Sequence, residues 1–248
     1  MRLKGKVAIV TGGGSGFGAG IVSKFVAEGA QVLVADLNLE GASEVATGAG
    51  AAARALRVDV SVAADVQAMI EAAELHFGRL DILVNNAGIG HLPQPLEALP
   101  EDQFDRLFAV NMKAIYLAMR EVVPRFKAHK GGVVLNMAST AGVSPRPRLA
   151  WYNASKGWVI TATRASAVEL APFGIRVNAL NPVAGETPLL ATFMGEDTPE
   201  MRAKFLATIP LGRFSTPADL GNAACFLCSD EASMITGVAM EVDGGRCI

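Results

Sequence analysis

The chain has 248 residues, is 51% hydrophobic, and carries 22 basic and 24 acidic side chains for a net charge of −2. This near balance, without a basic run of five residues, argues against a nucleic-acid-binding surface, and no apolar run is long enough to span a membrane. The apolar run before the first glycines is too short for a signal peptide, so we expect a cytoplasmic protein. The length suits one domain over residues 1–248 with a small-molecule partner.

Short runs rich in Val, Ile and Leu alternate along the chain with helical patterns. These runs are apolar on both faces, which is typical of parallel strands covered by helices on both sides. The sequence therefore predicts an α/β fold with a doubly wound, Rossmann-type parallel sheet of about seven strands and helices on both faces. The expected strands are 6–11, 31–36, 55–60, 81–86, 132–139, 175–180 and 238–243, and the clearest helical patterns are 66–77 and 104–123.

A glycine-rich turn, TGGGSGFG, follows the first expected strand and opens a helical pattern. Glycines let the backbone approach a pyrophosphate closely, and free N–H groups at a helix start attract its charge. The turn therefore predicts a dinucleotide site. Its candidate cofactor-binding residues are Gly12, Ser15, Gly16, Phe17 and Gly18.

Asp36 ends the second expected strand, eighteen residues after Gly18. A carboxylate at this place accepts hydrogen bonds from ribose hydroxyls and repels a 2′-phosphate, and the neighbours Leu37 and Asn38 carry no positive charge. We therefore expect NAD rather than NADP as the cofactor. The alternative is that Asp36 only caps the following helix.

The segment WYNASKG, residues 151–157, places a phenol and an ammonium one helical turn apart, because Tyr152 and Lys156 stand at i and i+4. Lowering the pKa of a phenol by about three units requires about 4 kcal/mol, which is roughly what a cation 4 Å away supplies at an effective dielectric of about 20. A tyrosinate near neutral pH could exchange a proton with an alcohol. The spacing alone also fits a surface pair without chemistry.

Residues 183–216 contain two short helical patterns where a simple crossover needs less chain. Extra chain after a parallel strand is where doubly wound folds place substrate contacts. Because Pro188 and Gly195 punctuate the segment, we predict a mobile substrate lid. Its expected inward-facing side chains are Leu189, Leu190, Phe193 and Met194, which could alternatively be ordinary core.

Neither the cysteines nor the histidines suggest a metal site. Cys225 and Cys228 form CxxC within an amphipathic helical pattern, and their spacing puts both on one face, as expected of packed thiols. His76, His91 and His129 are scattered singly.

Taken together, the glycine-rich turn, NNAG at 85–88, YNASK at 152–156 and EVDGG at 241–245 resemble the short-chain dehydrogenase/reductase family over essentially the whole chain. The resemblance implies that Tyr152 is the general acid/base and that Lys156 lowers its pKa and binds the nicotinamide ribose. It also implies that Ser139 binds the substrate oxygen and that Asn111 holds a proton-relay water.

The remaining cofactor contacts also come from the resemblance. The positions that it assigns, beyond the glycine-rich turn, Asp36, Tyr152 and Lys156, are Leu37, Asp59, Val60, Asn85, Asn86, Ala87, Gly88, Pro182, Val183 and Thr187. The chain departs from the common pattern at Phe17, where an aliphatic residue is usual, and at Val183, where many members have glycine.

The residues expected around Ser139 and Tyr152 are chiefly apolar. They are Ile89, His91, Leu92, Ala141, Val143, Trp151, Leu190, Phe193 and Met194. This lining favours a ring-bearing secondary alcohol, such as a 1-arylethanol, and its ketone. Trp151 could equally lie in a subunit contact. Arg146 and Arg148 could recognise an anion on the substrate or be solvated loop charges.

Two other functions remain open. A 3-oxoacyl-carrier-protein reductase would use the same catalytic residues, although Asp36 counts against the NADPH that such reductions generally need. A nucleotide-binding protein without turnover would not require all four of the catalytic-type residues Asn111, Ser139, Tyr152 and Lys156, and this chain has them all. The resemblance further implies a homotetramer, with helices at about 104–128 and 152–171 packed against copies of themselves.

Overall fold

The computed structural model describes residues 1–196 and 198–248. Seven strands in these residues form one sheet with the order β3-β2-β1-β4-β5-β6-β7, and every pairing is parallel. The strands are β1 (Val7–Thr11), β2 (Gln31–Asp36), β3 (Ala53–Arg57), β4 (Ile82–Asn85), β5 (Gly132–Met137), β6 (Ile175–Pro182) and β7 (Ala239–Val242). The predicted doubly wound α/β fold is confirmed.

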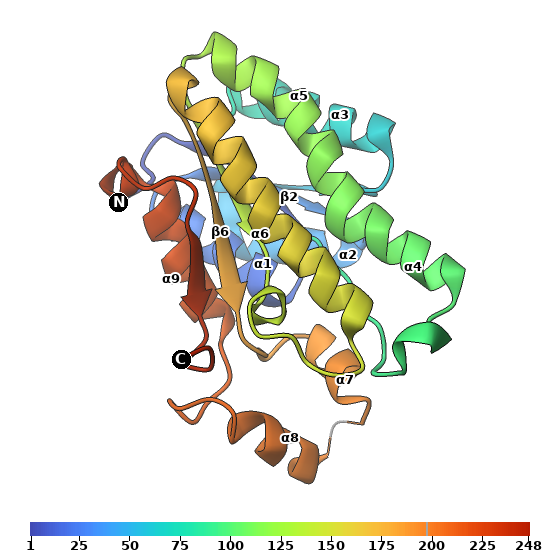
Figure 1. The fold of residues 1–248 in the computed structure, drawn as a ribbon. Coiled ribbons are helices and arrows are strands. Elements are labelled where there is room, and N and C mark those ends of the chain that lie inside the picture. Colours follow the sequence, from blue (N-terminus) through green and yellow to red (C-terminus); the bar gives the residue numbers. More distant parts are fainter. Residues whose placement is uncertain (197) are drawn as a thin grey trace.

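Helices cover both faces of the sheet (Figure 1). One face packs against α1 (Gly16–Ala27), α2 (Leu39–Ala49) and α9 (Pro217–Cys228), and the other against α3 (Ala63–Phe77), α5 (Ala114–Ala128) and α6 (Ala150–Leu170). Alternate residues of β1 enter the two cores, with Val10 in the first and Ile9 in the second. This explains why the central strands are apolar throughout.

The long helical pattern predicted at 104–123 is two helices joined by a π-helical turn. Helix α4 (Glu101–Phe108) passes through the turn Ala109–Lys113 into α5. Apolar residues continue at helical spacing through this turn. The sequence pattern therefore predicts one continuous helix and does not indicate the extra residue that widens the turn. The third strand also begins at Ala53 rather than 55, directly after a 3-10 turn at Gly50–Ala52.

Two short helices follow β6 in the segment for which a lid is predicted. They are α7 (Leu189–Met194) and α8 (Pro199–Leu206), and both lie beyond the carboxyl ends of the strands (Figure 1). Val183, Leu190, Met194, Ile209 and Phe214 form a small core of their own. The segment therefore has its own packed interior as well as a face toward the sheet.

Cys225 and Cys228 are buried on α9 within the core that α9 shares with α1, as expected of packed thiols. Burial raises the pKa of the Cys228 thiol to about 12. Among the described helices, none combines the length and the apolar character that crossing a bilayer requires.

Candidate active site

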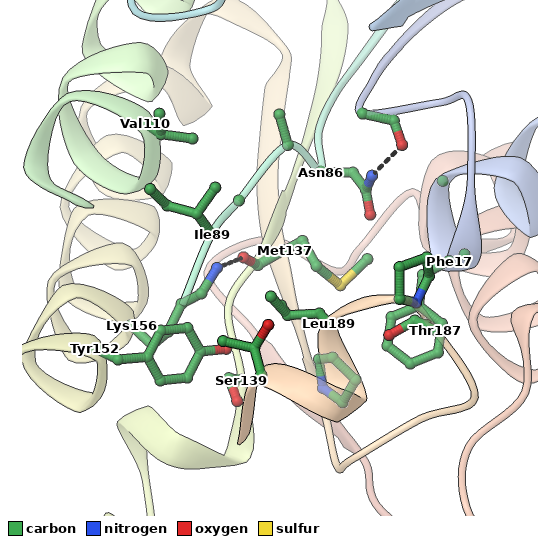
Figure 2. A pocket seen from close by; sticks show the side chains of 18 of the residues that line it. Phe17, Asn86, Ile89, Val110, Met137, Ser139, Tyr152, Lys156, Thr187 and Leu189 are labelled. Atoms are coloured by element: carbon green, nitrogen blue, oxygen red, sulfur yellow. Dashed lines mark hydrogen bonds between the residues drawn. The ribbon is translucent and has the colours of Figure 1, made fainter. Parts of the chain in front are cut away.

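A cavity of about 540 Å³ lies at the carboxyl ends of the central strands, bounded on one side by α7 (Figure 2). This is the edge where doubly wound folds bind ligands. Most residues predicted to bind the cofactor lie in its lining: Gly12, Ser15, Gly16, Phe17, Gly18, Asp36, Leu37, Asp59, Val60, Asn86, Ala87, Gly88, Tyr152, Lys156, Pro182, Val183 and Thr187. Asn85 does not line the cavity, because it is buried and its side-chain amide donates to the Asn136 side-chain oxygen at 2.9 Å. Of the residues predicted for the substrate pocket, those that line it are Ser139, Tyr152, Ile89, Ala141, Leu190 and Phe193.

The glycine-rich turn is fixed by close backbone packing. Gly12 and Gly16 have φ of 61° and 50°, in the left-handed region that favours glycine. A Cβ on Gly18 would lie 2.0 Å from the Gly12 carbonyl oxygen, so only glycine lets α1 start against the turn. From the residue that follows β4, the Asn86 side-chain amide donates to the carbonyls of Thr11 and Gly12, at 2.8 and 3.0 Å. These contacts hold the turn that leads into α1 at the cavity.

Asp36 does not cap the helix that follows it. The side chain of Asn38 caps α2 by accepting from the amides of Glu40 and Gly41. The Asp36 carboxylate instead accepts from the amides of Gly14 and Asn38, both at 2.9 Å, and lines the cavity. Its position is thus set by two backbone donors rather than by a role in α2.

Ser139 and Tyr152 come together from different elements (Figure 2). Ser139 follows β5, where its hydroxyl accepts from the Ala141 amide at 3.1 Å, and Tyr152 lies in the first turn of α6. Burial raises the pKa of Tyr152 to about 12, while a hydrogen bond with Ser139 and the charge of Arg146 act in the opposite direction. The phenol is therefore a proton donor at neutral pH in this arrangement.

Lys156 is buried one turn further along α6. Its ammonium donates to the Met137 carbonyl at 2.8 Å and lies 5.9 Å from the centre of the Tyr152 ring (Figure 2). Burial lowers the pKa of Lys156 to about 8. The sequence predicted that Lys156 lowers the pKa of Tyr152, but the net shift of Tyr152 is upward. The reason is that burial favours the uncharged forms of both groups.

Asn111 is buried in the π-helical turn and does not line the cavity. Its side-chain oxygen accepts from the Ile89 amide at 2.9 Å, and its nitrogen donates to the Ile89 carbonyl at 3.0 Å and the Ser155 hydroxyl at 3.1 Å. These contacts fix the chain that follows β4 against α6. The predicted water relay stays a prediction.

Five residues predicted to lie around Ser139 and Tyr152 are outside the lining: His91, Leu92, Val143, Trp151 and Met194. Trp151 is next to Tyr152, but consecutive helical residues point about 100° apart; its indole donates to the Leu96 carbonyl at 2.8 Å. His91 is buried, with Nδ1 2.9 Å from the Leu92 carbonyl oxygen. Met194 is turned into the core of the α7–α8 segment. None of them reaches the cavity in this structure, and their role in substrate binding stays a prediction.

The structure also brings residues to the cavity that the sequence did not single out, among them Arg106, Met137, Thr192 and Phe205. Met137 could have been found from its place just before Ser139 at the end of a strand. Phe205 carries no such signal, because only the packing of α8 turns it inward. Of the two arginines left open, Arg146 lines the cavity and Arg148 does not.

Comparisons with known proteins agree with this geometry. A family model described as enoyl-(acyl carrier protein) reductase matches residues 12–246. A 4-formylbenzenesulfonate dehydrogenase of Comamonas testosteroni is 50% identical over 100% of both chains. Galactitol 2-dehydrogenase of Agrobacterium fabrum is 38% identical over 99% of both.

Among solved structures, a 3-ketoacyl-(acyl-carrier-protein) reductase from Brucella melitensis complexed with NADH superimposes with a TM-score of 0.95. It is 54% identical and the match covers 99% of this chain and 100% of that one. Because full-length relatives at such identity are dehydrogenases and reductases, this protein is an enzyme, an oxidoreductase acting on alcohols or ketones. The chain belongs to the short-chain dehydrogenase/reductase family.

Proposed function

We propose that this enzyme interconverts a ring-bearing secondary alcohol and its ketone with NAD as the cofactor. The observation that carries the proposal is the position of Ser139 and Tyr152, which line one cavity together beside the aromatic ring of Phe193. Two hydroxyl groups beside an apolar surface suit an alcohol or ketone oxygen attached to a ring. We also propose that residues 183–216 act as the substrate lid of a single dehydrogenase domain.

The residues around the glycine-rich turn fit NAD. Ser15 at the start of α1 makes no side-chain capping bond, so the amides of the first turn remain available for a pyrophosphate. The Asp36 carboxylate is fixed by two amides and disfavours a 2′-phosphate. NAD, when bound, would take or give the hydride at the carbinol carbon. The related structure that contains NADH supports this choice.

The chain's own groups would handle the oxygen and its proton. Ser139 would donate a hydrogen bond to the ketone oxygen, and Tyr152 would give that oxygen a proton during reduction and take the hydroxyl proton during oxidation. A Lys156 pKa of about 8 leaves the ammonium mostly charged at neutral pH, so it can stabilise the phenolate that oxidation requires. We also propose that Lys156 binds the nicotinamide ribose and that Asn111 serves the proton relay.

Apolar side chains support a ring-bearing substrate. Ala141, Leu149 and Tyr152 form one cluster with Ile89 and Phe193. The Tyr152 and Phe193 rings lie 4.7 Å apart, centre to centre. The relative named for 4-formylbenzenesulfonate, an aromatic compound, is consistent with this class.

Reduction of a 3-oxoacyl group on a carrier protein is the second candidate. The 54% identity to a structure described as a 3-ketoacyl-(acyl-carrier-protein) reductase favours it. The chemistry at Ser139 and Tyr152 would be the same, so only the rest of the substrate distinguishes the two functions.

Steady-state kinetics test the proposal. The enzyme would be assayed with NAD and with NADP against 1-phenylethanol, cyclohexanol, a steroid alcohol and a 3-hydroxyacyl thioester. We expect turnover of an aryl or cyclic alcohol with NAD strongly preferred. Turnover confined to the thioester, particularly with NADP, would replace the proposal with the second candidate.

We further propose a homotetramer. Helices α4, α5 and α6 expose large apolar side chains, and a second copy of the chain packed on these helices would bury them. The exposed residues are Phe104, Phe108, Tyr116, Trp158 and Val168. Light scattering would show a mass near four chains, and a monomer would refute it. A cytoplasmic location is also proposed and is supported by the free cysteines.

A further inference from the structure

Arg146 brings a positive charge into the wall of the cavity. It lies in the loop before α6, and its guanidinium stacks over the Phe205 ring of α8, 4.1 Å from the ring centre. The Asn153 side chain donates to its backbone carbonyl at 2.7 Å, which ties the loop to α6. The Arg146 backbone is therefore fixed by its hydrogen bond to Asn153, and its guanidinium is positioned by the Phe205 ring.

The Arg146 guanidinium has no acidic partner in the part of the chain that the structure describes. Arg2, Arg125 and Arg213 each pair with a carboxylate, whereas the described contacts of the Arg146 guanidinium consist of the Phe205 ring. Burial, together with the like charge of Arg246, lowers the pKa of Arg146 to about 10. A half-buried cation that faces another cation and no acid would be stabilised by an anion in the cavity.

Arg146 is also close enough to the reacting groups to meet the same molecule. Its charge acts on the Tyr152 hydroxyl, and both side chains line one cavity. The residues lining the wall near them include Ala141, Leu149 and Phe193, which are apolar. A substrate ring seated on this wall would hold its alcohol at one end and present its other end to the arginine.

Arg148, two residues further on, provides an internal contrast. It has φ of 65°, is exposed, and does not line the cavity. Its carbonyl accepts from the Gln94 amide at 2.9 Å, so its backbone serves the loop. The structure thus separates two arginines that are equivalent in the sequence.

We propose that Arg146 is a substrate-binding residue for an anionic substituent, so that the substrate is a ring-bearing alcohol or ketone that carries a carboxylate or a sulfonate. This inference rests on the proposed function. A planar guanidinium offers paired N–H groups that match two oxygens of such an anion. Stacking on Phe205 covers one face of the guanidinium and leaves its edge free for that pairing.

The test compares charged and neutral substrates of one shape. Wild type, Arg146→Gln, Arg146→Lys and the matched control Arg148→Gln would be assayed with NAD. The substrates are 1-phenylethanol, 4-(1-hydroxyethyl)benzoate and 4-(1-hydroxyethyl)benzenesulfonate. We expect Arg146→Gln to lower kcat/KM for the better anionic substrate by about 10- to 100-fold. The same substitution should change kcat/KM for the neutral 1-phenylethanol by less than about threefold. Arg146→Lys should recover part of the loss, and Arg148→Gln should match wild type.

Equal losses for charged and neutral substrates in Arg146→Gln would overturn the inference, because Arg146 would then only support α8 through Phe205. Wild-type values of kcat/KM for Arg146→Gln with all three alcohols would overturn the inference as well. The relative rates of benzoate and benzenesulfonate identify which anion is preferred.

A binding measurement separates this inference from the proposed function. If wild type turns over none of the three alcohols, the proposed function fails, and 4-acetylbenzoate and acetophenone would be titrated calorimetrically into NAD-saturated wild type and Arg146→Gln. Tighter binding of 4-acetylbenzoate that is lost in Arg146→Gln supports the anion site. Equal binding of both ligands to both proteins refutes it.

Discussion

The aromatic rings of Tyr152 and Phe193 lie with their centres 4.7 Å apart and their planes tilted by 51°. Tyr152 belongs to α6 and Phe193 to α7, so this contact joins the proposed acid/base to the proposed lid. Gly90 makes room for it, because a Cβ there would lie 2.6 Å from a Phe193 ring carbon. Three segments far apart in the sequence therefore meet at one ring.

Gly90→Ala should displace the Phe193 ring and weaken its contact with Tyr152. Aromatic pairs contribute about 0.5–1.5 kcal/mol, so we expect kcat/KM for a 1-arylethanol to fall about two- to tenfold. Phe193→Leu should cause a similar loss, and the double variant should lose less than the two together. Gly48→Ala, where an added Cβ meets nothing within 4 Å, is the control. If the losses in kcat/KM from the two substitutions were fully additive, Gly90 would affect activity by a route other than the Phe193 ring.

Tyr152→Phe should remove proton transfer while keeping the shape of the cavity. We expect kcat to fall by about 10²- to 10⁴-fold, with the Kd for NAD changed by less than about threefold. Stopped-flow or steady-state absorbance of NADH and a fluorescence titration measure the two quantities. The other tyrosine of the chain, Tyr116, is exposed on α5, and Tyr116→Phe should behave as wild type. Retention of most activity in Tyr152→Phe would remove the tyrosine from the mechanism.

Lys156 should make stability depend on pH. Its pKa is about 8 in the folded chain against 10.5 for an ordinary lysine, so between these values the unfolded chain binds more protons and the free energy of unfolding rises with pH. The full rise is about 3 kcal/mol at 1.36 kcal/mol per unit.

Lys156→Met should lack that rise. Urea unfolding of both proteins from pH 7.5 to 9.5 measures it, and the difference between them isolates Lys156 because Tyr152 and Cys228 contribute to both. Lys113→Met, at an exposed position, is the control and should keep the wild-type slope. Parallel curves for wild type and Lys156→Met would show that the ammonium is solvated.

Asp36→Asn combined with Leu37→Arg should shift cofactor preference toward NADP. The change removes a carboxylate that repels a 2′-phosphate and adds a guanidinium in the lining, while the asparagine oxygen still accepts from one of the two amides. We expect the ratio of kcat/KM for NADP to that for NAD to rise about 10- to 100-fold. Leu75→Arg adds the same charge at an exposed place on α3 and should leave the ratio unchanged. An unaltered ratio in the double variant would mean that Asp36 does not face the adenosine ribose.

Local patterns in the sequence were enough to predict the sheet and the parts of the site that belong to single elements. Strands buried on both faces are apolar throughout, and a glycine turn or a Tyr-x-x-x-Lys pair is defined by spacing along one short segment. The glycine-rich turn, Asp36, Tyr152 and Lys156 accordingly all lie in one cavity.

Tertiary structure decided the rest. The rotation of a helix or loop against the sheet decides which of two similar, nearby side chains reaches the cavity. Tyr152, Phe193 and Arg146 reach it, whereas Trp151, Met194 and Arg148 do not. The sequence does not indicate this rotation, because the two residues of each pair are alike in type and close in position. The upward shift in the pKa of Tyr152 follows from burial, which many segments create together. The sequence by itself determined which elements form and which chemistry they carry. Only packing determined which side chains face that chemistry and in which charge state, because burial and proximity are properties of the assembled chain.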